Sequence, residues 1–223
     1  MTRLRSTVSA RGTLLAAALA CTAGAGASRL RITPALDGGK ALAQFELEEP
    51  SAWTIADGAL VLRSAGTPAG PIRRPSRLAV LKSAAFGDVT LRARVRCDAP
   101  VKLKGRDVLL LFGYQSPTRF YYVHLSNETT YPHNGIFVVA DADRKRLHEV
   151  AGEPRLHDRE WHAVRLVRDV ARGSIEVYLD GDAKPALAAT DRTLLAGRVG
   201  FGSFDDTGAF TDIVVEGEAA AAP

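Results

Sequence analysis

Residues 160–185, EWHAVRLVRDVARGSIEVYLDGDAKP, decide the fold of this 223-residue chain. Apolar residues occupy alternate positions in two runs, one from Val164 to Leu166 and one from Ile175 to Leu179. This alternation is typical of strands that bury one face, and Gly173 and Asp180-Gly181 are turn signals. The segment therefore predicts two antiparallel strands of a half-buried sheet.

Similar short apolar runs, separated by Gly, Pro, Asn and Asp, continue along the chain. Asp57-Gly58 predicts a hairpin turn, and the nearly all-apolar run Val108 to Tyr114 predicts a central strand covered on both faces. The density of Gly and Pro between Ser64 and Arg77 predicts a loop. No segment has a strong helical pattern, so we expect an all-β sandwich or barrel. The remaining expected strands are near residues 45–47, 53–55, 59–62, 78–81, 89–97, 120–125, 136–139, 147–150, 186–189, 198–204 and 210–215.

The N-terminus has the composition of a secretory signal. Three arginines precede the apolar run of residues 14–20, and Ala25-Gly26-Ala27 fits a small-x-small cleavage site. We expect residues 1–27 to be a signal peptide, 28–43 a lead-in, 44–217 the folded domain and 218–223 a disordered tail. The protein is then exported to the periplasm or outside the cell. Lipid attachment at Cys21, as in an outer-membrane lipoprotein, stays open as an alternative.

Composition excludes several classes of partner. The apolar run is too short to span a membrane. Removing residues 1–27 takes away three Arg and no acid, which lowers the formal net charge of +4 by three and removes the compositional support for nucleic-acid binding. The one cysteine left, Cys97, cannot form an internal disulfide and continues an apolar pattern, so we expect it to be buried.

The hairpin WHAVRLVRD…GSIEVYLDG resembles that of concanavalin A-like jelly rolls, which include laminin-G modules, family 16 glycoside hydrolases and the 3-keto-disaccharide hydrolase domain family. The resemblance extends from about Phe45 to Gly217. It implies a two-sheet antiparallel β-sandwich from an exported bacterial protein. Family 16 enzymes carry an E-x-D-x-x-E strand that supplies nucleophile and acid. No such segment exists here, so a retaining hydrolase of that type is not expected.

The predicted strand 89–97 places Thr90, Arg92, Arg94 and Arg96 on its outward side. Alternate residues of a strand lie about 6.5–7 Å apart, so the guanidinium groups would form a ladder. One interpretation is an exposed surface with acidic neighbours. The other is a basic groove for carboxylated or sulfated sugars, because Arg pairs bidentately with such groups.

A second candidate set is Tyr122, His124, His133 and Asn134. We expect Tyr122 and His124 to share the outward side of their strand, with His133-Asn134 in the following loop. An aromatic ring can cover the apolar face of a pyranose while polar groups take its hydroxyls. The alternative is that the Tyr and the His are hydrogen-bonded within the sheet and bind no ligand, and both interpretations stay open.

Arg165, Glu176 and Tyr178 on the opening hairpin form a third set. Arg165 and Glu176 are expected to face each other, either as an ordinary ion pair or as part of the same groove. If the protein is an enzyme acting on 3-keto sugars, His124, Glu176 or Tyr122 would supply its base and acid.

Asp205, Asp206 and Asp212 are the candidate metal ligands. Carboxylates in a tight loop and the strand after it can bind calcium, and folds that resemble this one often carry a structural calcium near the terminal strand. The spacing matches no EF-hand, and Asp-rich turns are common without metal.

These observations predict an exported protein that binds carbohydrate in a groove around Arg94, Tyr122, His124 and Arg165. A glycoside hydrolase or eliminase using the same groove is the first alternative. A laminin-G-like module that binds a protein partner is the second.

Overall fold

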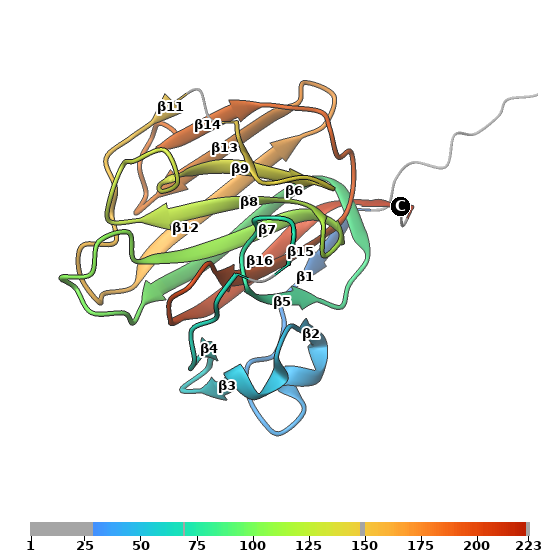
Figure 1. The fold of residues 1–223 in the computed structure, drawn as a ribbon. Helices are drawn as coiled ribbons and strands as arrows, with labels where there is room; N and C mark the ends of the chain where they lie inside the picture. The colour runs from blue at the N-terminus through green and yellow to red at the C-terminus, as the bar shows by residue number, and fades with distance from the viewer. Residues whose placement is uncertain (1–28, 69, 148–149, 222–223) are drawn as a thin grey trace, which may run out of the picture.

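The chain forms two antiparallel β-sheets with an apolar core between them (Figure 1). The computed structural model describes residues 29–68, 70–147 and 150–221. These residues contain two short 3₁₀ helices, η1 (Ala41–Gln44) and η2 (Pro50–Ala52), and no α-helix. The predicted all-β sandwich is confirmed. The expected signal peptide and Cys21 lie outside the described residues.

The first sheet has nine strands, with the order β11-β14-β13-β12-β6-β16-β4-β3 and β1 paired to β16. Its strands are β1 (Arg29–Ile32), β3 (Trp53–Ala56), β4 (Ala59–Leu62), β6 (Ala85–Cys97), β11 (Val150–Ala151), β12 (His162–Asp169), β13 (Ser174–Leu179), β14 (Leu187–Thr190) and β16 (Gly208–Ala220).

The second sheet has seven strands in the order β10-β9-β8-β7-β15-β5-β2. They are β2 (Phe45–Leu47), β5 (Arg77–Leu81), β7 (Asp107–Ser116), β8 (Arg119–Ser126), β9 (Gly135–Ala140), β10 (Lys145–Arg146) and β15 (Arg198–Ser203).

Residues 160–185 contain the hairpin of β12 and β13, whose alternation of apolar and polar residues explains its place in the sandwich. Leu166 and Val177 are fully buried and directly opposite each other, while the residues between the apolar ones point outward. Both Asp180 and Gly181 have positive φ, as do Asp57 and Gly58 between β3 and β4. Such backbone favours Gly and Asp and suits tight hairpins, so both predicted turns are confirmed.

The seven-stranded sheet is covered on both of its faces. Val108 and Leu110 of β7 face the main core, whereas Leu109 and Leu111 belong to a second apolar cluster on the other side. Ile72, from the long loop before β5, packs against this second cluster. The prediction of a central strand covered on both faces is confirmed, and the loop supplies the cover.

Three boundaries differ from expectation. The lead-in contains β1, which pairs with β16, and the expected tail starts inside β16, which continues to Ala220. The strand expected at residues 147–150 is replaced by β10, paired with β9, and β11, paired with β14 of the other sheet. The chain passes from one sheet to the other here, so a single apolar run could not predict two short strands in different sheets.

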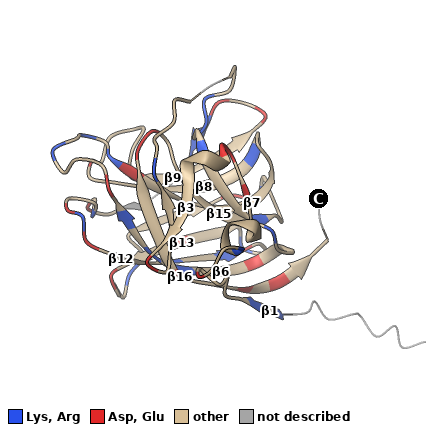
Figure 2. Ribbon diagram, turned by 90° about the horizontal axis from the view of Figure 1, so that it is seen from below, with Lys and Arg blue, Asp and Glu red and all other residues tan. Residues whose placement is uncertain are grey.

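Charges of both signs are distributed over the ribbon, and the basic strand β1 lies beside acidic residues of β16 (Figure 2). Arg31 pairs with Glu216 across these two strands. None of the helices in the described part of the chain has the length and apolar character needed to cross a membrane.

Candidate functional site

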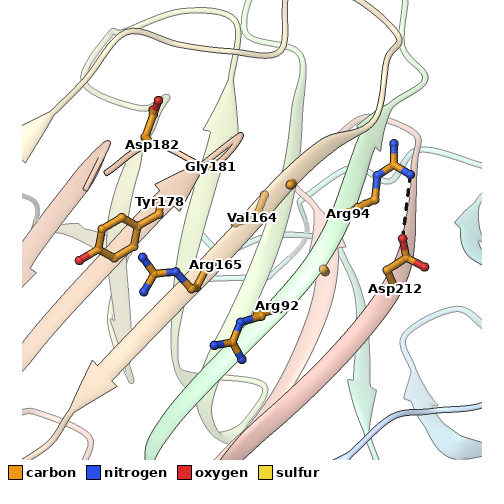
Figure 3. A pocket seen from close by; sticks show the side chains of 10 residues that line it. Arg92, Arg94, Val164, Arg165, Tyr178, Gly181, Asp182 and Asp212 are labelled. Carbon is orange, nitrogen blue, oxygen red and sulfur yellow. Dashed lines mark ion pairs between the residues drawn. The ribbon is translucent and has the colours of Figure 1, made fainter. Parts of the chain in front are cut away.

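A pocket of about 400 Å³ opens on the outer face of the nine-stranded sheet (Figure 3). It lies over β6, β12 and β13, next to the start of the turn after β13 and to β16. A volume of this size is within the range of small-molecule sites. Its lining residues are Arg92, Ala93, Arg94, Ala163, Val164, Arg165, Tyr178, Gly181, Asp182 and Asp212.

Strand register brings the pocket's basic and aromatic side chains together. Arg165 of β12 is directly opposite Arg92 of β6 on one side and Tyr178 of β13 on the other. The three residues therefore form a row across three strands on the outer face. Arg94 lies two residues after Arg92 on β6, on the same face, and is opposite Ala163 of β12. The small side chain of Ala163 leaves space beside Arg94, which helps to form the hollow.

Arg165 stacks on Tyr178. Its guanidinium carbon lies 3.7 Å from the centre of the Tyr178 ring, well within the range of a cation–π contact. The Tyr178 hydroxyl donates a hydrogen bond of 2.8 Å to Glu176, and this bond raises the pKa of Tyr178. The expected pairing of Arg165 with Glu176 is wrong, because the register puts Val167 opposite Glu176.

The other two arginines of the pocket have acidic neighbours. Arg92 donates to Glu216 over 2.7 Å, and this bond, with that from Arg31, lowers the pKa of Glu216. Arg94 lies 4.0 Å from Asp212, the contact marked in Figure 3. Asp212 has a φ of 51° and sits where the register of β16 shifts, at a β-bulge. Bulges re-aim side chains, and this one directs a carboxylate toward the pocket.

Tyr122 and His124 are not part of this site. Both are on β8 in the seven-stranded sheet, with exposed fractions of 0% and 2%. They lie on the expected side of β8, opposite to Tyr121, but Phe204 and Arg144 cover that side: the Phe204 ring stacks on His124, and Arg144 donates to the Tyr122 hydroxyl. The prediction of one groove shared by Arg94, Tyr122, His124 and Arg165 is therefore wrong.

His133 and Asn134 stay near His124 rather than the pocket. The His133 ring lies edge-on to His124 at 5.5 Å, and its Nδ1 is 2.7 Å from Thr130 Oγ1. Asn134 is buried and donates to the carbonyl of Gly152 over 3.1 Å. Its amide is thus occupied by the backbone.

The candidate catalytic residues do not converge. His124 and Tyr122 are buried in one sheet, and Glu176 lies on the outer face of the other. Within the described residues these three cannot act on one substrate atom.

The candidate metal ligands divide in the same way. Asp205 and Asp206, between β15 and β16, lie with Asp107 so that one carboxylate oxygen from each is within 4.8 Å of the others. Asp212 faces Arg94 instead. Asp107 was missed from the sequence because a single Asp before an apolar run carries no periodic signal. Asp182, which lines the pocket, was missed because it follows a turn and belongs to no strand pattern.

No protein-family model matches this chain, and no curated protein matches it. Solved structures do match. The carbohydrate binding module CBM66 from Bacillus subtilis has a TM-score of 0.59 at 14% identity, covering 78% of this chain and 95% of that one. The fold is concanavalin A-like.

Two further solved structures show how widely the fold is shared. Winged bean acidic lectin, complexed with methyl-alpha-D-galactose, has a TM-score of 0.59 at 11% identity, covering 87% of this chain and 99% of the lectin. The GH43 protein BlXynB from Bacillus licheniformis has a TM-score of 0.51 at 12% identity, over 79% of this chain but 37% of its own. Identities this low establish the architecture alone.

Proposed function

We propose that this protein binds carbohydrate in the pocket formed by Arg92, Arg94, Arg165 and Tyr178. The concanavalin A-like fold supports the proposal, since similar structures include a carbohydrate binding module and a lectin complexed with a galactoside. The pocket adds a local argument, because it combines an aromatic ring with several donors in a volume of about 400 Å³.

The stack of Arg165 on Tyr178 is the observation that carries the proposal. In the described part of the chain Arg165 forms no ion pair with an acidic side chain, whereas Arg92 is paired with Glu216. The stack holds the Arg165 guanidinium in place and leaves its charge uncompensated. A fixed guanidinium loses little entropy when it donates to a ligand.

The charge of the pocket favours an acidic sugar. Arg165 brings an unpaired positive charge, and Arg94 is only loosely paired, with 4.0 Å between its Nη1 and Asp212 Oδ2. A uronic acid carboxylate or a sulfate could accept hydrogen bonds from both groups. Neutral sugars would use the same donors through their hydroxyls and bind more weakly.

The proposal includes export, as the composition of residues 1–27 indicates, because extracellular or periplasmic glycans would then be accessible to the pocket. Attachment through Cys21 would keep the same pocket at a membrane surface.

A glycan array tests this function. The chain should be screened against neutral, uronic and sulfated oligosaccharides, alongside Arg165→Ala, Tyr178→Ala and the control Arg172→Ala, whose side chain is 83% exposed on the β12–β13 turn. Binding that both pocket variants lose and the control keeps supports the proposal. If the pocket variants still bind glycans, the binding site lies elsewhere on the protein. If the wild-type chain binds no glycan on the array, a protein partner is favoured. Product formation would make the protein an enzyme.

A further inference from the structure

Trp161 extends the outer face of the nine-stranded sheet beyond the pocket. It directly precedes β12, and the pocket residues Ala163 and Arg165 follow it at alternate positions, so the three lie along one face. Ala163 is directly opposite Arg94, and the same register places Trp161 beside Arg96. The exposed Ala163 therefore lies between Arg165 and Trp161, about 6.5 Å from each along the strand.

Two arginines hold the indole ring of Trp161. The guanidinium carbon of Arg96 lies 4.7 Å from the centre of the ring, and that of Arg94 lies 5.8 Å from it. Both distances are within the range of cation–π contacts. Arg96 donates to both carboxylate oxygens of Asp98, over 2.6 and 3.3 Å, and this pair fixes its guanidinium. Arg96 therefore positions the indole while its own charge is compensated.

The indole N–H of Trp161 is not used by the fold. The other tryptophan, Trp53, is 4% exposed and donates its indole N–H to the carbonyl oxygen of Glu48 over 3.1 Å. Trp161 is only half-buried, and its indole N–H has no acceptor within residues 29–68, 70–147 and 150–221. Such an indole offers an apolar surface and a hydrogen-bond donor at one point. This combination suits the ring and the hydroxyls of a sugar.

Arg94 connects Trp161 to the pocket. Arg94 and Asp212 lie on one side of the pocket, and Arg165 and Tyr178 lie on the other (Figure 3). The Arg94 side chain is 47% exposed and is 4.0 Å from Asp212, so it is able to donate to a ligand in the pocket while it lies next to the Trp161 ring. A sugar held by Arg94 and Arg165 would therefore have its neighbour in the glycan chain at Trp161.

We propose that Trp161 forms a second sugar subsite next to the pocket, so that the ligand is an acidic oligosaccharide of at least two units. This inference rests on the carbohydrate binding proposed for the pocket. The acidic unit occupies the pocket beside Arg94 and Arg165, and the next unit packs against the Trp161 ring and accepts a hydrogen bond from its N–H. The step of about 6.5 Å between alternate residues of a strand is comparable with the length of one sugar unit.

The opposite direction of the glycan chain is less favourable. Asp182 lines both the pocket and a second hollow of about 410 Å³, which is also lined by Arg155 and Lys184. Arg155 donates to Asp182 over 2.7 Å, so this ion pair lies where the two hollows meet. Among the described residues that line the second hollow, none is aromatic. A sugar unit there would find polar contacts but no ring to pack against.

The length of the glycan tests the second subsite. The uronic probes are galacturonic acid and its linear oligomers of two to four units, and the sulfated probes are galactose 4-sulfate and carrageenan oligosaccharides of two and four units. In calorimetric titrations of the full chain we expect the disaccharide to bind about tenfold more tightly than the monosaccharide, as one well-packed aromatic contact allows. Trp161→Ala should reduce this ratio to about one. The control Lys184→Ala, in the second hollow, should keep the ratio.

Tryptophan fluorescence gives a second readout on the unmutated chain, because Trp53 is buried and Trp161 is the accessible one of the two tryptophans. The disaccharide should change the emission more than the monosaccharide does, and Trp161→Phe should remove the change. Equal affinities for the two probes, or a length effect lost in Lys184→Ala but kept in Trp161→Ala, would overturn the second subsite and leave the pocket in place. Binding that Arg165→Ala leaves unchanged, or no binding of any probe, would instead contradict the proposed function and this inference with it.

Discussion

Arg165 and Tyr178, directly opposite each other on β12 and β13, form a stack in which the guanidinium carbon is 3.7 Å from the ring centre. The contact depends on register, because a shift of one residue would turn one of the two side chains into the core. The turn from Val170 to Gly173 sets that register, with Gly173 at a φ of 75° and its amide bonded to the Val170 carbonyl. A feature of the backbone therefore determines the chemistry of the pocket.

Protonation of His162 should stabilise the fold at acidic pH. The ring lies between Asp180, at 2.9 Å, and Asp158, at 3.1 Å. Partial burial opposes its charge, but these two bonds outweigh burial and hold the pKa of His162 above its ordinary value of 6.5. Since the folded state keeps the proton more tightly, the added stability is complete below pH 6.5 and is lost as pH rises through the folded-state pKa.

Urea unfolding between pH 5.5 and 8.5 measures this effect. Relative to His162→Gln, we expect the wild-type protein to lose on the order of 1 kcal/mol across the range, the size of a hydrogen bond to a charged group. Taking the difference between the two proteins cancels the titration of other groups. Parallel stability curves would show that His162 does not contribute.

The buried Arg106 should be essential for stability. It has an exposed fraction of 0% and donates to the backbone carbonyls of Cys97, Leu156 and Asp158. Arg106→Met would leave these acceptors without a partner, at a cost of about 3 kcal/mol or more.

Thermal unfolding followed by circular dichroism checks the Arg106 prediction. Arg172→Met is the matched control, because Arg172 is an exposed arginine on a turn. We expect this substitution to change Tm very little. Equal Tm values for the two variants would mean that Arg106 is replaceable.

Gly197 should tolerate no side chain. A Cβ at this position would lie 2.2 Å from the carbonyl carbon of Gly113 on β7, and backbone atoms cannot easily move away. We expect Gly197→Ala to cost roughly 3 kcal/mol through overpacking. Gly39→Ala, with nothing within 4 Å of its added Cβ, is the control and should unfold at the wild-type denaturant midpoint. A wild-type midpoint for Gly197→Ala would refute the clash.

The strands could be predicted from sequence because alternation directly reflects burial of one face. In β13 Ile175, Val177 and Leu179 are buried, while Glu176 and Tyr178 between them are half-buried on the outer side, as the pattern required. The pairing of Arg165 with Tyr178 could not be predicted in the same way. Turn residues in the sequence show that a turn is present, but they do not give the register of the two strands. Asp107 gave no signal at all, since its partners come from distant segments.

Burial of Tyr122 and His124 shows a second limit. Their side of β8 was correctly separated from the Tyr121 side, but alternation cannot say whether a non-core side meets solvent. Here Arg144 and Phe204 cover it, and neither belongs to a pattern connected with β8. A polar or aromatic residue on the second face of a sheet is therefore a weak indicator of an accessible site when long loops are present.

The most direct test of the central claim is a crystal structure of the protein soaked with the acidic oligosaccharide that binds best on the array. We expect the sugar to lie in the pocket on the nine-stranded sheet, with its carboxylate or sulfate within hydrogen-bonding distance of the Arg165 guanidinium. A sugar bound anywhere else, with the Arg165–Tyr178 stack untouched, would contradict the proposed function.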